Sequence, residues 1–168
     1  KFINHFCYYL STRFEPSYVE NHISDIVDNI APEMPNHISR WGNTDWPGNG
    51  DMLMWNQNIN YVQNFGALRA DIVFNHVESY FGLSLSSSLE ISAYPEEGGS
   101  LYTSNQEIPE NPWGATYFND IPIEITAVPN PGYIFSHWAG PGIMYEPTLT
   151  IILSNNINLT AVFVEDSN

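Results

Sequence analysis

The chain has 168 residues, 43% of them hydrophobic and 14% aromatic, which is enough apolar material for a packed core in one domain or two small ones. Its 4 Lys and Arg residues against 19 Asp and Glu residues give a net charge of −15, which argues against nucleic acid and anionic membrane surfaces as partners. The single cysteine, Cys7, excludes an internal disulfide and a site of several thiolates, and no apolar run approaches the roughly 20 residues that cross a bilayer.

Residues 1–83 have the apolar spacing of helices. Apolar side chains follow one helical face from Phe2 to Leu10, so we expect the chain to begin inside a helix. A second helix is predicted over residues 16–31, because Pro16 suits a first turn and apolar residues then recur every three or four positions. A short third helix is expected from Pro35, with Gly42 as its C-terminal cap.

Two further helices are predicted after a loop. Asp51 caps the first of them, and Phe65 and Gly66 end or kink it. The second has its apolar stripe from Leu68 to Phe81, before Gly82. The result is five helical segments in 83 residues, each with an apolar face that needs a partner.

The loop over residues 43–51 is rich in Asn, Asp and Gly, so its oxygen atoms suggest a calcium site with Asp45, Asn49 and Asp51 as candidate ligands. Its spacing does not match an EF-hand. The same residue types are those that turns select, and turn chemistry explains them without a metal. No cofactor is expected.

After residue 83 the apolar period changes from 3.6 to 2, and no Lys or Arg follows. We read residues 84–88 as a linker and residues 89–168 as a small all-β or β-grasp-like domain of six or seven strands. Strands are predicted around Leu89–Tyr94, Leu101–Thr103, Ile121–Ala127, Tyr133–Trp138, Leu149–Leu153 and Ile157–Phe163, with a turn at Pro131 and Gly132. The fold class is therefore α+β in segregated parts, with residues 1–83 as an all-α helical bundle fragment.

The first part resembles the C-terminal helical portion of the CotH family, the spore-coat-protein-H-type atypical kinases. The residues that carry the resemblance are Phe14-Glu15-Pro16, Ile23 to Ile30, Ala31-Pro32-Glu33-Met34-Pro35-Asn36-His37, Arg40-Trp41, Trp55, Phe65 with Arg69, and Phe81-Gly82-Leu83. The resemblance implies a kinase-like parent protein whose nucleotide, metal and catalytic motifs lie upstream of this helical end.

The second part resembles the divergent internalin-type B-repeat, a bacterial repeat domain. The matching positions are Gly98-Gly99-Ser100, Ile123–Ala127, Asn130-Pro131-Gly132-Tyr133, Phe135, Trp138-Ala139-Gly140, Leu149–Leu153 and Leu159–Phe163. Extra residues between Ser104 and Trp113 depart from the compact form of that domain and leave the 105–113 loop unassigned. The resemblance implies an extracellular spacer, adhesion or surface-display role.

No catalytic constellation is visible in the residues, and the only lysine is Lys1. Trp113 and Tyr117 are candidates for a sugar-stacking platform on the inserted loop, although aromatic residues also close small β cores. Trp138 is expected in the core, and residues 86–168 are expected to fold alone.

Taken together, the sequence predicts a non-catalytic part of an exported CotH-like protein that acts as a scaffold and surface interaction or spacer module. A carbohydrate-binding module and a calcium-dependent adhesin are the alternatives. We expect a protein or cell-surface partner, with carbohydrate as another possibility, and an extracellular or cell-surface location in a bacterium.

Overall fold

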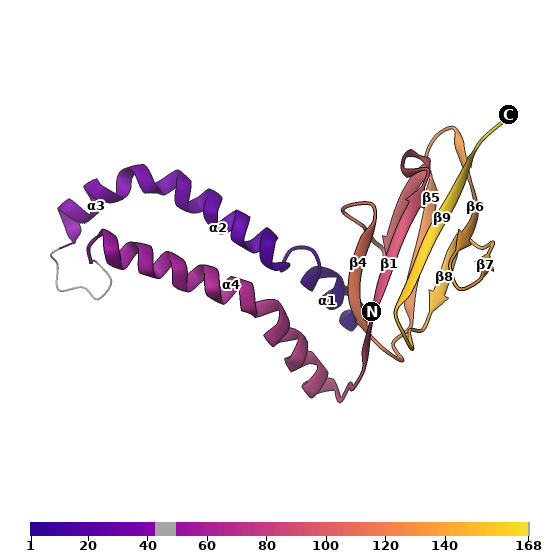
Figure 1. The fold of residues 1–168 in the computed structure, drawn as a ribbon, viewed down its shortest axis with the longest axis horizontal. Coiled ribbons are helices and arrows are strands. Elements are labelled where there is room, and N and C mark those ends of the chain that lie inside the picture. The colour runs from indigo at the N-terminus through magenta and orange to yellow at the C-terminus, as the bar shows by residue number, and fades with distance from the viewer. Residues whose placement is uncertain (43–49, 168) are drawn as a thin grey trace. The chain divides into compact units, whose positions relative to one another are not determined.

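The computed structural model describes residues 1–42 and 50–167, and it has helices first and strands second. The helices are α1 (Phe2–Leu10), α2 (Pro16–Ile30), the 3-10 turn η1 (Ala31–Glu33), α3 (Met34–Trp41) and α4 (Met52–Phe81). The contacts divide the chain into a helical unit, residues 13–73, and a β unit, residues 1–12 with 74–168. The predicted class, α+β in segregated parts, is confirmed (Figure 1).

The helix boundaries follow the chemistry of their ends. Glu15 caps α2 by accepting a hydrogen bond from the Tyr18 amide at 3.0 Å, and Pro16 occupies the first helical position. Gly42 is the C-cap of α3, and its amide donates to the Ile38 carbonyl at 2.7 Å. Gly82 ends α4 with φ at +66°, a left-handed conformation that glycine adopts without strain.

Of the two alternatives predicted at Phe65 and Gly66, the end of a helix is wrong, because α4 is one helix of 30 residues. Gly66 has a packing role instead. A Cβ atom there would lie 2.7 Å from Cγ1 of Val19 on α2, so the absence of a side chain lets α2 and α4 approach closely. Four α-helices and one 3-10 turn therefore stand where five helical segments were expected in the described part of residues 1–83.

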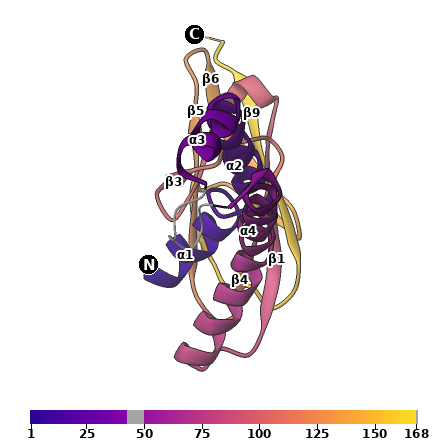
Figure 2. The same cartoon turned by 90° about the vertical axis from the view of Figure 1, so that its left-hand side faces the viewer.

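The β unit contains two stacked sheets. One has the strand order β4-β1-β9-β6-β7 and the other the order β3-β2-β5-β8. The strands are β1 (Ser86–Tyr94), β2 (Gly99–Thr103), β3 (Gln106–Glu107), β4 (Trp113–Phe118), β5 (Ile123–Pro129), β6 (Tyr133–Ala139), β7 (Ile143–Met144), β8 (Thr148–Ile151) and β9 (Ile157–Glu165). The turned view in Figure 2 separates β1 and β9 on one side from β3 and β5 on the other.

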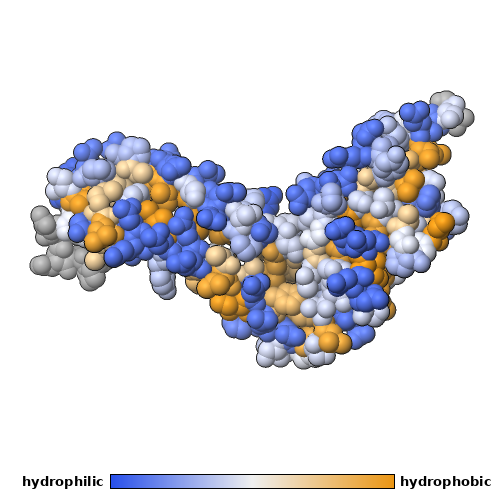
Figure 3. Space-filling model, viewed as in Figure 1, coloured by the Kyte–Doolittle hydropathy of each residue, from blue (hydrophilic) through white to orange (hydrophobic). Residues whose placement is uncertain are grey.

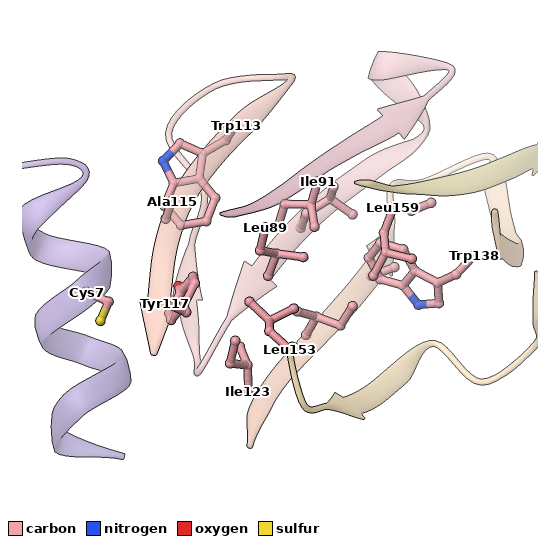
Figure 4. Close-up of a cluster of buried hydrophobic side chains, with 14 of the residues drawn as sticks. Cys7, Leu89, Ile91, Trp113, Ala115, Tyr117, Ile123, Trp138, Leu153 and Leu159 are labelled. Atoms are coloured by element: carbon pink, nitrogen blue, oxygen red, sulfur yellow. The ribbon is translucent and has the colours of Figure 1, made fainter. Parts of the chain in front are cut away.

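All six predicted strands are confirmed, and their alternating side chains meet between the sheets. Leu89, Ile91, Ile123 and Trp138 are completely buried there (Figure 4), and so is Ile125. The expected linker at 84–88 overlaps β1, because Ser86 already pairs with Phe118 of β4. The unassigned 105–113 loop contains β3 and the first residue of β4.

Helix α1 packs into the β unit beside strands β3 and β4. Asn4 Nδ2 donates to the Pro122 carbonyl at 2.7 Å, and Tyr8 Oη donates to the Glu107 carbonyl of β3 at 2.6 Å. Cys7 points toward β4 in Figure 4 and is 1% exposed. These contacts cover the open side of the sandwich between its edge strands. The domain boundary predicted after residue 83 stays a prediction, since packing units and domains need not coincide.

Candidate interaction surfaces

A cavity of about 460 Å³ lies between α2 and α4 in the helical unit, and we call it the α2–α4 groove. Its apolar walls are formed by Phe14, Tyr18, Val19, Ile23, Val62 and Phe65. The two helices bring these residues together because each carries an apolar stripe at helical spacing, and Gly66 lets the stripes meet. The size and the lining are typical of a site that binds an apolar group.

Two arginines also line the α2–α4 groove. The Arg13 guanidinium donates to Tyr18 Oη at 2.7 Å and lies 5.3 Å from the centre of the Tyr18 ring. The Arg69 guanidinium lies 5.5 Å from the centre of the Phe65 ring. Within residues 1–42 and 50–167, neither arginine forms an ion pair with a carboxylate. Each guanidinium has five N–H donors, so several remain available to an anionic group.

The apolar surface continues beyond the groove. No residue of α2 is buried, and Ile26, Ile30, Leu53 and Tyr61 on α2 and α4 are 51%, 43%, 64% and 73% exposed. Figure 3 shows hydrophobic residues on the surface over these helices. Exposed apolar side chains gathered on neighbouring helices are typical of binding faces.

Asp51, one of the three candidate calcium ligands, has a structural role at the start of α4. Its Oδ1 atom accepts a hydrogen bond from the Met54 amide at 2.9 Å, and its carbonyl accepts one from the Trp55 amide at 3.1 Å. Asp45 and Asn49 lie outside the described residues. In the described ranges no group of three or more His, Cys, Asp or Glu side chains is arranged to hold a metal ion.

Trp113 and Tyr117, the candidate sugar platform, are 2% and 0% exposed. Both point inward from β4, where Tyr117 Oη and Thr103 Oγ1 share a hydrogen bond of 2.9 Å. The Trp113 ring lies 5.6 Å from the Tyr8 ring of α1. Stacking on a sugar needs an exposed ring face, and neither residue has one. The alternation of Trp113, Ala115 and Tyr117 with Gly114 and Thr116 was the sequence signal for this buried strand.

Burial also governs the chemistry of Cys7. Its removal from water raises the pKa of the thiol from 9.0 to about 12, against a smaller lowering by a backbone hydrogen bond from Phe118. The thiolate is the nucleophilic form of cysteine. Because Cys7 stays protonated at neutral pH, it is unreactive there.

We therefore expect Ellman's reagent at pH 8 to modify Cys7 far more slowly in the native chain than in urea. Because the folded pKa is raised, the thiol's contribution to stability is complete below pH 9 and is lost as the pH rises toward 12. Denaturant melts of the chain and of Cys7→Ala across this range measure the loss, which should be smaller in the variant. Rapid labelling of the folded chain at pH 8 would contradict the assignment.

The α2–α4 groove was not predicted from the sequence. The sequence shows the two apolar stripes and the four isolated basic residues. It does not show that the two stripes face each other or that two of the basic residues lie beside them. Arg13 and Arg69 are 56 positions apart, and only the turn of the chain through η1 and α3 places them at one cavity.

The fold defines a two-part protein. A helical hairpin exposes an apolar groove, and a two-sheet β sandwich follows it in the chain. Residues 1–73 match the family described as CotH kinase protein, and residues 89–167 match the divergent InlB B-repeat domain. The chain therefore carries a CotH kinase family segment followed by a B-repeat domain, which confirms both resemblances. No curated protein and no solved structure matches it. Within the part that the structure describes, no helix is long and apolar enough to span a membrane.

Proposed function

We propose that this chain is a non-catalytic scaffold of an exported CotH-like protein, with the B-repeat domain as a spacer at a bacterial surface. In the same proposal, the helical unit binds a protein partner through the α2–α4 groove. B-repeats are typically surface or spacer modules, which supports the spacer role. The observation that carries the proposal of a protein partner is the apolar face of α2, on which no residue is buried.

The exposed face has a large capacity for stabilising a complex. Full burial of one large apolar side chain contributes about 1.5 to 3 kcal/mol relative to exposure. Ile26, Phe65 and Leu68 are each more than half exposed. Several such side chains, buried together by one partner, offset the entropy that association costs.

The shape of the site favours a helix as the bound element. The groove lies between two packed helices, and a third helix fits such a groove by placing apolar side chains at positions i, i+3, i+4 and i+7 into it. The apolar surface extends along α2 and α4 well past the cavity, which a small molecule would leave uncovered.

The charges indicate that this helix is acidic along its flanks. Arg13 and Arg69 are two of only four Lys or Arg residues in a chain of net charge −15, and both line the groove without an ion-pair partner in its described part. Carboxylates beside the apolar stripe would form charge-assisted hydrogen bonds with them. The partner is thus an amphipathic helix with Asp or Glu next to its apolar face.

Calorimetry on the full chain tests this with two synthetic amphipathic peptides that share one leucine stripe and carry either Glu or Lys at the flanking positions. We expect the Glu peptide to bind and the double variant Arg13→Gln/Arg69→Gln to weaken it by about 10- to 100-fold, since hydrogen bonds to charged groups contribute about 1.5 to 3 kcal/mol. Arg40→Gln is the matched control, because Arg40 does not line the groove.

Three outcomes would overturn the partner assignment. The first is a Lys peptide that binds as tightly as the Glu peptide, and the second is a double variant that binds the Glu peptide as tightly as the unsubstituted chain does. The third is a dimer in light scattering that the double variant abolishes, because a second copy of the chain would then occupy the groove. MgATP in the same calorimeter is expected to give no binding heat, and micromolar binding of the nucleotide would overturn the non-catalytic assignment.

A further inference from the structure

The first and last strands of the β sandwich are neighbours and run parallel. β1 and β9 pair in six register positions, from Leu89 opposite Ile157 to Tyr94 opposite Val162. They lie in the interior of the five-stranded sheet, with β4 beside β1 and β6 beside β9 (Figure 1). All other strand pairs in the described chain are antiparallel.

This arrangement determines how tension acts on the domain. The chain enters the sandwich at Ser86 and leaves it after Glu165, and in a parallel pair these two points lie at opposite ends of the ladder. Tension along the chain therefore pulls β1 and β9 past each other along their length. Because parallel ladder bonds are evenly spaced along the strands, all of them bear such a load together.

Additional contacts tie the same two strands together. Ser92 Oγ and Thr160 Oγ1 share a hydrogen bond of 2.9 Å, and Asn158 Nδ2 donates to Glu90 Oε1 at 3.3 Å. At the start of the ladder, the Ser88 amide donates to Asn156 Oδ1 at 3.0 Å.

The inner face of the ladder is shielded from water. Buried residues of both strands cover it, namely Leu89, Ile91, Ala93, Leu159, Ala161 and Phe163. Water therefore competes poorly for the backbone hydrogen bonds of the ladder on this side.

We propose that the parallel β1–β9 pair is a mechanical clamp that keeps the β domain folded while the chain is under tension. This inference rests on the proposed spacer role, because a spacer at a surface transmits the pull between its attachment and whatever it binds. Resistance to a pull depends on the barrier to unfolding in the pulled direction rather than on the free energy of unfolding alone.

Single-molecule force spectroscopy of the full chain, held at both termini, measures this resistance. We expect the helical segments to extend first and the β sandwich to rupture last. Residues 86–165 have an extended length of roughly 280 Å, at about 3.5 Å per residue, and their rupture releases this length less the distance between the two ends in the folded sandwich. Its rupture force should be severalfold higher than that of the helical events.

A second pulling geometry is the matched control. Holding the same chain at its C-terminus and at Pro131→Cys loads the antiparallel β6–β9 pair from one end, where Tyr133 faces Glu165. Bonds in this geometry open one after another, so we expect rupture at a severalfold lower force although the folding free energy is nearly the same. The native Cys7 is buried and does not compete for coupling.

A variant tests the residues of the clamp. Ser92→Ala combined with Thr160→Val removes the side-chain bond between β1 and β9 and should lower the rupture force from the termini, with little change in the second geometry. Equal forces in the two geometries, or a sandwich that ruptures no later than the helices, would overturn the clamp. Peptide binding at the α2–α4 groove is measured separately. If the force measurements contradict the clamp and the peptide still binds, only the clamp is overturned. If the peptide does not bind and the force measurements agree with the clamp, only the partner proposal is overturned.

Discussion

Replacing Trp138 by alanine is expected to lower the free energy of unfolding of the β unit by about 3 to 5 kcal/mol. The indole is completely buried between the sheets, and its Nε1 donates to the Pro147 carbonyl at 3.3 Å. It also packs beside Phe135, with ring centres 6.0 Å apart. Alanine would leave a cavity that the surrounding side chains fill only partly. The Pro147 carbonyl would lose the indole donor and keep the Ala127 amide, which donates to it at 2.9 Å. A loss of this size is a large share of the about 5 to 15 kcal/mol that stabilises a typical domain.

Two companion variants separate the causes of that loss. Trp138→Phe keeps most of the ring area and removes the indole donor, so it should lie well above Trp138→Ala in stability. Tyr145→Ala is the surface control, because Tyr145 is 72% exposed and such changes usually stay within about 0.5 kcal/mol. Urea melts followed by tryptophan fluorescence and circular dichroism give the values. A Trp138→Ala chain as stable as the Tyr145→Ala chain would contradict the burial of the indole.

Removing residues 1–12 is expected to destabilise the β sandwich by several kcal/mol, although these residues precede the helical unit in the chain. Ile3, Phe6, Cys7 and Tyr8 pack against the core of the sandwich, and burial of each contributes up to about 1.5 to 3 kcal/mol. The hydrogen bonds that α1 makes to β-unit carbonyls are lost in the same step. Hydrogen exchange of the β4 amides in the shortened chain measures the effect.

Adjacent tyrosines provide a matched pair for the same contact. Tyr8→Ala removes a ring that lies against Trp113 and a hydroxyl that donates to β3, so a loss of about 2 kcal/mol or more is expected. Tyr9 is 39% exposed, and its bond to Gln106 is long at 3.3 Å, so Tyr9→Ala should change stability much less. If the shortened chain and Tyr8→Ala both melt like the full chain, α1 does not close the sandwich.

The expectation that residues 86–168 fold alone stays a prediction, and these contacts bear on it. Helix α1 belongs to the CotH match by sequence and to the β unit by packing. Phe74, near the end of α4, stacks on Phe118 of β4 with ring centres 4.3 Å apart. A β fragment without these helical residues would expose apolar surface that the full chain covers.

Most of the elements could be predicted because each follows from a local property of the chain. The stripe in α2 and the alternation in β1 and β5 are periodicities that read directly as helix or strand. The turn before β6 was visible for the same reason, since Gly132 has φ at +87° and only a few residue types adopt that conformation readily. The 105–113 loop could not be assigned from the sequence, because the residues that carry β3 and the start of β4 there match no motif of the B-repeat resemblance.

The candidate sites were harder to predict than the elements. Trp113 and Tyr117 could be read as a surface platform because the sequence does not say which side of a strand is covered, and α1 covers theirs. Asp51 was correctly placed as a helix cap, which is a relation between residues three positions apart. The α2–α4 groove depends on how two helices pair, and no local pattern encodes this.

By itself, the amino-acid sequence determined the kind and order of most of the elements, the resemblance to the two families and the buried role of Trp138. It could do so because helix and strand periods, caps, turns and family motifs are all encoded over short stretches of chain. Only the tertiary structure decided that α1 closes the sandwich, that Arg13 and Arg69 line one groove, and that β1 and β9 run parallel side by side. The hydrogen bonds from α1 to the strands and turns of the β unit join residues 97 to 118 positions apart, and such pairings are selected by the packing of the whole domain rather than by any segment of it.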